Sequence, residues 1–117
     1  MDATDSPHYV VATFVKSGRD GDFEQFMRDV VVPAEARVRP DHVGRWHLLR
    51  PAADQPEGAS RAWLMTFHGP FPLDDWNLQP LFDEAYGADA SREHLARFED
   101  MVEGEQTLYA LDGEVSL

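Results

Sequence analysis

The 117-residue sequence predicts an α+β domain in which strands and helices follow one another in the order β-α-β-β-α-β. Two patterns predict this class. Runs rich in β-branched and aromatic residues, typical of strands, alternate with stretches whose apolar residues recur at three- and four-residue spacing, typical of helices. The composition, 43% hydrophobic and 11% aromatic, is that of a globular protein. We therefore expect one domain over residues 8–117, preceded by a loose tail over residues 1–7.

The first half of the chain predicts a strand, a helix and a second strand. HYVVATFVK, residues 8–16, has the composition of a strand, and the turn SGRDGD follows it. Asp22 and Gln25 have the spacing of a capping box at the start of a helix. Apolar residues then keep helical spacing as far as Pro33, which is expected to kink or end the helix. Residues 43–50 predict the second strand.

The second half predicts two further strands around a long helix. RAWLMTFHG, residues 61–69, is the most apolar strand, and PFPLDD connects it to the helix. The apolar residues of this helix form two stripes, one ending before Gly87 and one running from His94 to Val102. Glycine at this point is suited to a helix C-terminus, so the helix is expected to be broken there. Residues 104–115 predict the last strand.

This order of elements is that of the ferredoxin-like motif, a four-stranded antiparallel sheet with two helices on one face. In the first and third predicted strands, both alternating sets of side chains are apolar. An antiparallel sheet with one face in water should instead alternate with polar residues. A second layer is therefore expected on the bare face, and another copy of the chain is the simplest source of it, so the sequence predicts a two-fold homodimer.

Three segments, in this element order, resemble the dimeric α/β-barrel superfamily: YVVATFVKSGRDGDFEQFM, VGRWHLLRP and RAWLMTFHG. The resemblance covers about residues 8–114 and is to small antibiotic-biosynthesis monooxygenases and polyketide cyclases. It implies a dimeric barrel and an enzyme that acts on a hydrophobic small molecule without a cofactor, although the fold does not choose the reaction. The haem-degrading branch resembles the chain poorly, because its pattern asks for an asparagine on the first strand and Asn77 is the only asparagine here.

Charge and composition argue against several other classes. A net charge of −12 opposes binding to nucleic acid or to an anionic membrane. The absence of cysteine excludes thiolate chemistry, and no histidine pair has metal-ligand spacing on a helix, so no metal is expected. No phosphate loop or dinucleotide fingerprint indicates an organic cofactor. The N-terminus lacks a leader pattern, and no segment reaches the roughly 18 apolar residues of a membrane span, so we expect a cytoplasmic protein.

His47, in the sequence GRWHLL, is the first candidate for catalysis, because histidine titrates near neutral pH. On a strand, Arg45 shares its face, would help to keep the imidazole neutral as a general base, and could stabilise an anion. The competing interpretation is that both residues only protect an edge strand. His68, at the end of the third strand, is the second catalytic candidate, against a solvated strand end. Which sheet face lines a pocket stays open, since both are apolar.

Aromatic residues are the candidates for substrate binding, because they stack on planar molecules and their hydroxyls orient carbonyl groups. Each of them also suits plain core or dimer packing. The PFPLDDWNLQP connector is a candidate lid over the pocket. His94 is expected in the core, whereas His8 and His42 are expected to be exposed in turns. The candidate binding residues are Trp46, Trp63, Trp76, Tyr9, Tyr86 and Phe82.

Two functions follow from these observations. The first is a cofactor-independent enzyme that cyclises, isomerises or oxygenates an aromatic or polyketide-like molecule. The second is a non-catalytic dimeric protein that binds a hydrophobic ligand or partner. Turnover that depends on His47 while binding does not would favour the enzyme.

Overall fold

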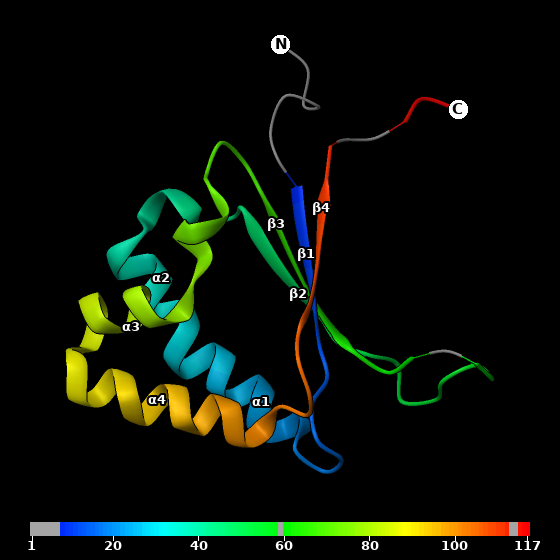
Figure 1. Cartoon of the computed structure of the whole chain (residues 1–117), viewed down its shortest axis with the longest axis horizontal. Coiled ribbons are helices and arrows are strands. Elements are labelled where there is room, and N and C mark those ends of the chain that lie inside the picture. The colour runs from blue at the N-terminus through cyan, green and yellow to red at the C-terminus, as the bar shows by residue number, and fades with distance from the viewer. Residues whose placement is uncertain (1–7, 59, 113–114) are drawn as a thin grey trace.

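A four-stranded antiparallel sheet with all helices on one face forms the framework of the protein (Figure 1). The structure is a computed structural model that describes residues 8–58, 60–112 and 115–117, so the predicted tail lies outside the described residues. The strand order β2-β3-β1-β4 is the ferredoxin-like topology, which confirms the predicted fold class. The strands are β1 (His8–Thr13), β2 (Trp46–Leu49), β3 (Trp63–His68) and β4 (Thr107–Leu111).

The first helix is continuous but changes its winding in the middle. It consists of α1 (Asp20–Phe26), the π-helical turn η2 (Met27–Val31) and α2 (Val32–Val38). Pro33 does not end the helix, because it lies in the first turn of α2, directly after the π-helical turn. A proline ring clashes with the carbonyl four residues earlier in a regular α-helix, and a wider π turn at that point relieves the clash.

The start of this helix differs from the predicted capping box. The helix begins at Asp20, so Asp22 lies within the first turn and makes no capping hydrogen bond. Its carboxylate instead accepts a hydrogen bond of 2.9 Å from the Arg19 guanidinium. Two acidic residues in the first turn still stabilise the positive end of the helix dipole.

The second helix is broken where the sequence predicts. Helix α3 (Leu78–Tyr86) and helix α4 (Ala88–Met101) meet at Gly87, whose φ of +88° is a conformation that glycine adopts readily. Two 3₁₀ turns, η3 (Pro40–His42) and η4 (Leu73–Trp76), lead from α2 and β3 toward the elements that follow. None of the helices in the described ranges is long and apolar enough to cross a membrane.

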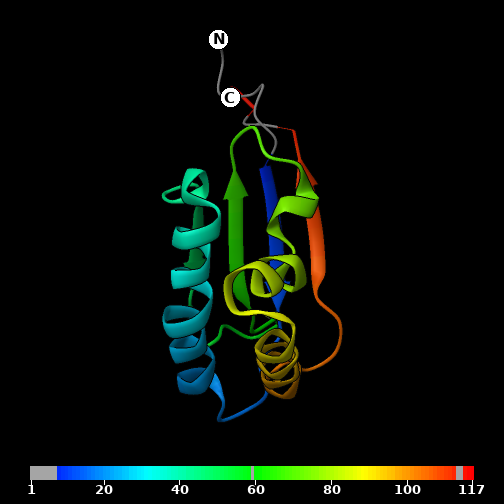
Figure 2. The same ribbon diagram turned by 90° about the vertical axis from the view of Figure 1, so that its left-hand side faces the viewer.

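The strand register sorts the side chains of the sheet into two faces. Trp46 pairs with Phe67 and Leu48 with Met65, and these four side chains face the helices and pack on the core. Figure 2 looks through the helices onto this face. The opposite face, called the open face below, carries the other alternating set on the four strands. Its residues are His8, Val10, Ala12, His47, Leu49, Leu64, Thr66, His68, Thr107, Tyr109 and Leu111.

Candidate active site

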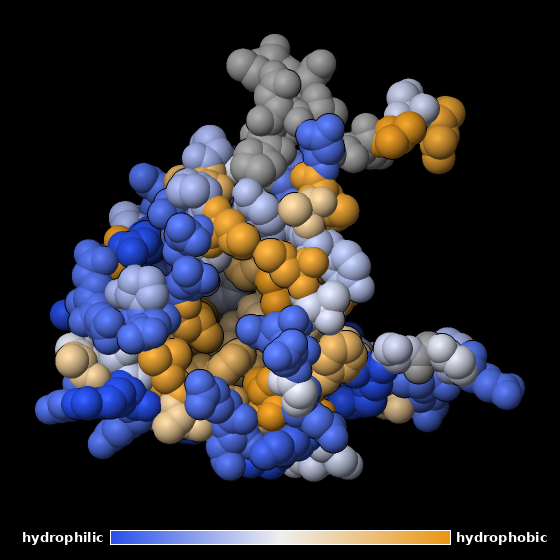
Figure 3. Space-filling view, in the orientation of Figure 1, coloured by the Kyte–Doolittle hydropathy of each residue, from blue (hydrophilic) through white to orange (hydrophobic). Residues whose placement is uncertain are grey.

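A cavity of about 140 Å³ lies between the helix-facing side of the sheet and the helices. Figure 3 shows a hollow lined by hydrophobic residues between these two layers. Its wall is mostly apolar and includes two tryptophans, Trp46 from β2 and Trp76 from η4. Three polar side chains, those of Glu35, Asn77 and Gln106, also line it. Apolar cavities with a few convergent polar groups are typical of small-molecule sites.

A buried carboxylate–imidazole pair borders this cavity. Glu35 of α2 and His42 of η3 are only 4% and 2% exposed, and a Glu35 carboxylate oxygen lies 2.9 Å from His42 Nδ1. Burial raises the pKa of the Glu35 carboxyl above its ordinary value of 4.5, although the nearby imidazole favours the charged form. A carboxyl group shifted in this direction is a stronger base than an ordinary carboxylate and is suited to accept a proton from a substrate.

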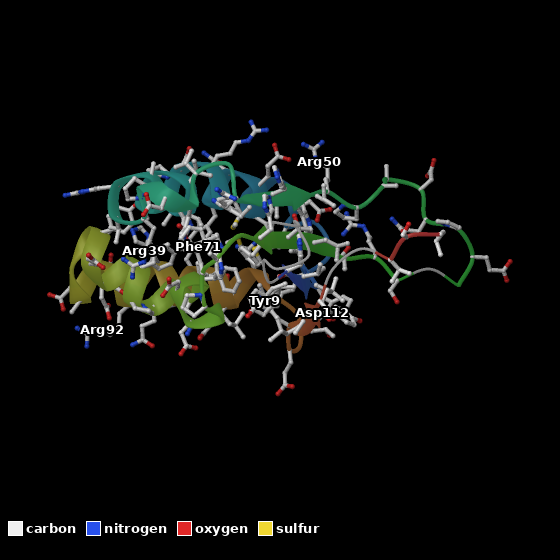
Figure 4. The ribbon with its side chains drawn as sticks, turned by 90° about the horizontal axis from the view of Figure 1, so that it is seen from above. Tyr9, Arg39, Arg50, Phe71, Arg92 and Asp112 are labelled. Carbon is white, nitrogen blue, oxygen red and sulfur yellow. The ribbon has the colours of Figure 1, made fainter. Side chains whose placement is uncertain are left out.

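The local chain path explains why these two residues meet. Helix α2 ends at Val38, and the following 3₁₀ turn folds the chain back, with His42 N–H donating to the carbonyl of Arg39. The imidazole is then enclosed by two aromatic rings from the segment after β3. Its ring centre lies 3.9 Å from that of Trp76 and 4.4 Å from that of Phe71, which is labelled in Figure 4.

The buried position of His42 corrects the sequence-based prediction that it is exposed in a turn. The prediction is wrong because Trp76 and Phe71, which cover His42, come from a distant part of the chain. The seven-residue spacing from Glu35 to His42 equals about two helical turns, and this is the one local signal that relates the two residues. This spacing would place both residues on one side of a helix only if the helix continued past Pro40, where it is expected to stop.

The predicted catalytic residues lie on the open face of the sheet. The imidazoles of His47 and His68 are stacked, with ring centres 5.6 Å apart. His8 extends this row, 6.2 Å from His68, so its predicted position in an exposed turn is wrong: it is half-buried in β1. Burial lowers the pKa of His68, and the charges of His47, His8 and Arg45 lower it further. Arg45 directly precedes β2, and its carbonyl accepts the His68 N–H.

The predicted aromatic residues are divided between the cavity and the core. Trp46 and Trp76 line the cavity. Trp63 is 2% exposed, and its indole N–H donates to Asp20. The remaining three lie in or against the core. Phe82 is fully buried, Tyr9 packs half-buried against the core, and the Tyr86 hydroxyl donates to the Val30 carbonyl.

The sheet therefore separates the predicted bases from the tryptophans that line the cavity. His47 and His68 project from one face, and Trp46 and Trp76 lie on the other. His94, as expected, lies among aromatic rings, 5.0 Å from Tyr86. Within the described ranges, no three histidine or carboxylate side chains are placed to share a metal ion.

Comparison with known proteins gives a likeness in structure only. No protein-family model matches the sequence, and no curated protein matches it. A NIPSNAP family protein of unknown function from Agrobacterium tumefaciens matches with a TM-score of 0.57 and 12% identity, over 94% of this chain and 91% of that protein. A candidate antibiotic biosynthesis monooxygenase from Caulobacter crescentus matches with a TM-score of 0.52 and 13% identity, over 95% and 92%.

The chain has the fold of these proteins. A second structure of the Agrobacterium tumefaciens protein gives the same result, with a TM-score of 0.51 at 13% identity over 88% of this chain and 90% of that one. The likeness confirms the ferredoxin-like α+β fold that the sequence predicts. At this level of identity the likeness does not extend to which residues act.

Proposed function

We propose that the protein is a cofactor-independent enzyme of specialised metabolism that binds a flat hydrophobic molecule in the cavity and removes a proton from it. The observation that carries this proposal is the buried Glu35–His42 pair at the wall of an apolar, aromatic-lined cavity. A titratable group with a shifted pKa in such a cavity is a candidate for catalysis. The description of the Caulobacter crescentus protein as a candidate antibiotic biosynthesis monooxygenase supports an enzyme of specialised metabolism.

The size of the cavity limits what it holds. An apolar protein cavity of about 150 Å³ accommodates a benzene molecule. The cavity here, about 140 Å³, therefore suits one aromatic ring of a larger substrate. Trp46 and Trp76 offer the aromatic surfaces on which that ring would pack.

The chemistry we propose is the transfer of a proton from an acidic C–H or O–H group of the substrate to the Glu35 carboxylate. The hydrogen bond to His42 holds the carboxylate in place and shares the proton once it is transferred. The negative charge left on the substrate would face the amides of Asn77 and Gln106. One amide N–H of Gln106 donates to the Thr13 hydroxyl at 2.8 Å, which fixes its orientation. Cyclisation, isomerisation and oxygenation of such substrates can all begin with this step.

Solvent deuterium exchange tests the proposal. 1-Phenylbutane-1,3-dione offers a single aromatic ring beside an acidic CH₂ group, and we expect the protein to accelerate its exchange in D₂O. Because a positioned base contributes about 10²–10⁴-fold, Glu35→Gln should slow the exchange at least about 100-fold. Its affinity for the dione, followed by tryptophan fluorescence, should change by less than about twofold. Glu93→Gln, on the exposed side of α4, is the matched control. A Glu35→Gln protein that keeps its rate would contradict the proposal.

A second candidate site lies on the open face, with His47 as base, Arg45 as anion stabiliser and His68 beside them. The observation that favours it is the stacking of His47 on His68, whose lowered pKa favours the uncharged form of the His68 imidazole. This site would need a second copy of the chain to enclose it. If His47→Gln abolished the exchange and Glu35→Gln did not, the base would lie on the open face.

The alternative function is a non-catalytic dimeric protein that binds a hydrophobic ligand. It would bind the dione without accelerating its exchange, and Glu35→Gln would change neither property. In both cases we propose a cytoplasmic homodimer joined through the open face.

A further inference from the structure

A groove of about 470 Å³ lies next to the cavity, between the first helix and the edge strand β2. The cavity and the groove share three wall residues, Met27, Glu35 and Trp46, so they are adjacent compartments around the Glu35 side chain. A substrate with one ring in the cavity would place the rest of its structure in this groove. The residues of the groove therefore bear on what that remaining part is.

Two arginines share one carboxylate at the rim of the groove, and Glu35 is the other carboxylate of its lining. Arg28 and Arg50 both pair with one carboxylate, that of Glu24, at 3.0 Å and 2.5 Å. The arginine side chains are 72% and 64% exposed, so each has N–H donors that remain accessible. The neighbouring Asp20 carboxylate is held by Arg61 and by the Trp63 indole. On a chain with a net charge of −12, a groove lined by as many arginines as carboxylates is a local exception.

The wall of the groove is apolar apart from Glu24, Arg28, Glu35, Arg50 and His47 of the edge strand. Val32 and Val43 are large hydrophobic side chains that stay 46% and 61% exposed, and both line the groove. Leu48, half-buried in β2, adds further apolar surface. An apolar wall below a pair of arginines suits a molecule with an apolar body and an anionic end.

We infer that the cavity and the groove together bind an aromatic organic acid, with its ring beside Glu35 and its carboxylate between Arg28 and Arg50. The position of the ring rests on the proposed function; the position of the carboxylate rests on the groove. The planar guanidinium group forms paired hydrogen bonds with a carboxylate, which makes arginine the appropriate residue for this contact. Glu24 neutralises the charge of one arginine, and the ligand carboxylate pairs with the positive charge that remains.

Binding of 4-phenylbutanoate and of its neutral amide, 4-phenylbutanamide, tests this inference. The general field of a chain at −12 repels anions, so a preference for the acid must come from a local site. We expect the carboxylate to bind about tenfold more tightly than the amide at pH 7.5, because hydrogen bonds to charged groups are the stronger ones. In the double variant Arg28→Gln/Arg50→Gln, the two ligands should bind within about twofold of each other.

Arg92→Gln is the matched control, because Arg92 is an exposed arginine of α4 paired with Asp89, whereas Arg50 lies beside β2 (Figure 4). It should keep the preference for the acid, and circular dichroism should show that all variants are folded. Three results would overturn the proposed carboxylate site in the groove and leave the cavity proposal intact. They are equal affinities for the two ligands in the unaltered protein, a preference for the acid that survives in the double variant, and a preference that is lost equally in Arg92→Gln. Failure of both ligands to bind would overturn both.

Discussion

Glu35 is the residue whose environment departs most from what its type prefers. Carboxylates are almost never fully buried unless they are paired, and here the partner is the equally buried His42. Because burial raises the pKa of Glu35, the folded protein holds a proton there more tightly than the unfolded chain does. A group kept at such a cost in stability is typical of a functional site.

This linkage predicts how Glu35→Gln changes stability. The unfolded carboxyl titrates near 4.5, and the folded one at a higher pH. As the pH rises from 4.5 through the folded pKa, the native protein loses a proton less readily than the unfolded chain, so Glu35 reduces the free energy of unfolding in that range. Glutamine does not titrate, so the free energy of unfolding of the variant is not reduced in this way as the pH rises.

Urea unfolding at pH 4.5, 6.0 and 7.5 measures the effect. We expect the difference in unfolding free energy between the variant and the unaltered protein to shift in favour of the variant as the pH rises. The same variant should have lost its exchange activity, so stability and activity would move in opposite directions. A difference that does not change with pH would show that the carboxyl is not perturbed by burial.

At the scale of elements, two irregularities shape the helical layer. The π-helical turn before Pro33 lets the first helix run on to Glu35, and Gly87 turns the chain between α3 and α4. Without the π-helical turn, Pro33 would interrupt the helix before Glu35, and this residue would not reach the wall of the cavity. Without the turn at Gly87, α3 and α4 would form one straight helix that could not follow the surface of the sheet.

Gly87 and Gly21 form a matched pair for testing the second irregularity. A methyl group added at either position meets no atom within 4 Å, so packing contributes nothing to the comparison. Gly87 has a φ of +88°, and Gly21 lies in α1 without a positive φ. We expect Gly87→Ala to lower the free energy of unfolding by about 1–3 kcal/mol. Gly21→Ala should raise it by about 0.5–1 kcal/mol, both measured by urea unfolding. Equal effects would mean that the break needs no glycine.

At the scale of the whole molecule, the open face differs from the rest of the surface. None of its strand residues carries a carboxylate, although the chain has a net charge of −12. Charge repulsion between two copies is therefore weak where two such faces meet. Leu49, Tyr109 and Leu111 are large apolar groups that remain exposed on it, as expected of a surface that another copy covers.

We expect the proposed association to depend on pH, because a row of histidines lies on the open face. The groups that face one another across the strands are His8, His47 and His68, with Arg45 at the end of the row. The pKa of His68 is lowered below 6.5 in the folded chain, so its contribution to folding stability is complete above pH 6.5 and is lost as the pH falls through the folded pKa. Burial in a dimer strengthens this effect, because desolvation opposes charging.

Light scattering after size exclusion tests the prediction. We expect a species of twice the 13.2 kDa chain mass at pH 8.0 and a growing fraction of single chains at pH 5.5. His47→Gln/His68→Gln should remain dimeric at both values. Single chains at pH 8.0 would refute association through the open face, and a dimer insensitive to pH in the unaltered protein would refute the role of the histidines.

The order of elements was determined by the sequence alone, and so was the break at Gly87. Apolar periodicity is a local property of strands and helices, and it predicted elements of both kinds correctly. The alternation in GRWHLL was also correct, since Trp46 and Leu48 face one way and His47 and Leu49 the other. These features depend only on neighbours within a few residues.

Only the tertiary structure decided which sheet face the helices cover and which histidine is buried. Both faces are apolar, so the sequence could not tell whether His47 or Trp46 would look toward the cavity. The burial of His42 depends on Trp76 and Phe71, which fold over it after the third strand. Burial of a turn residue is set by whatever distant segment packs on it, whereas the pattern of a strand or helix is set by the residues of that element itself.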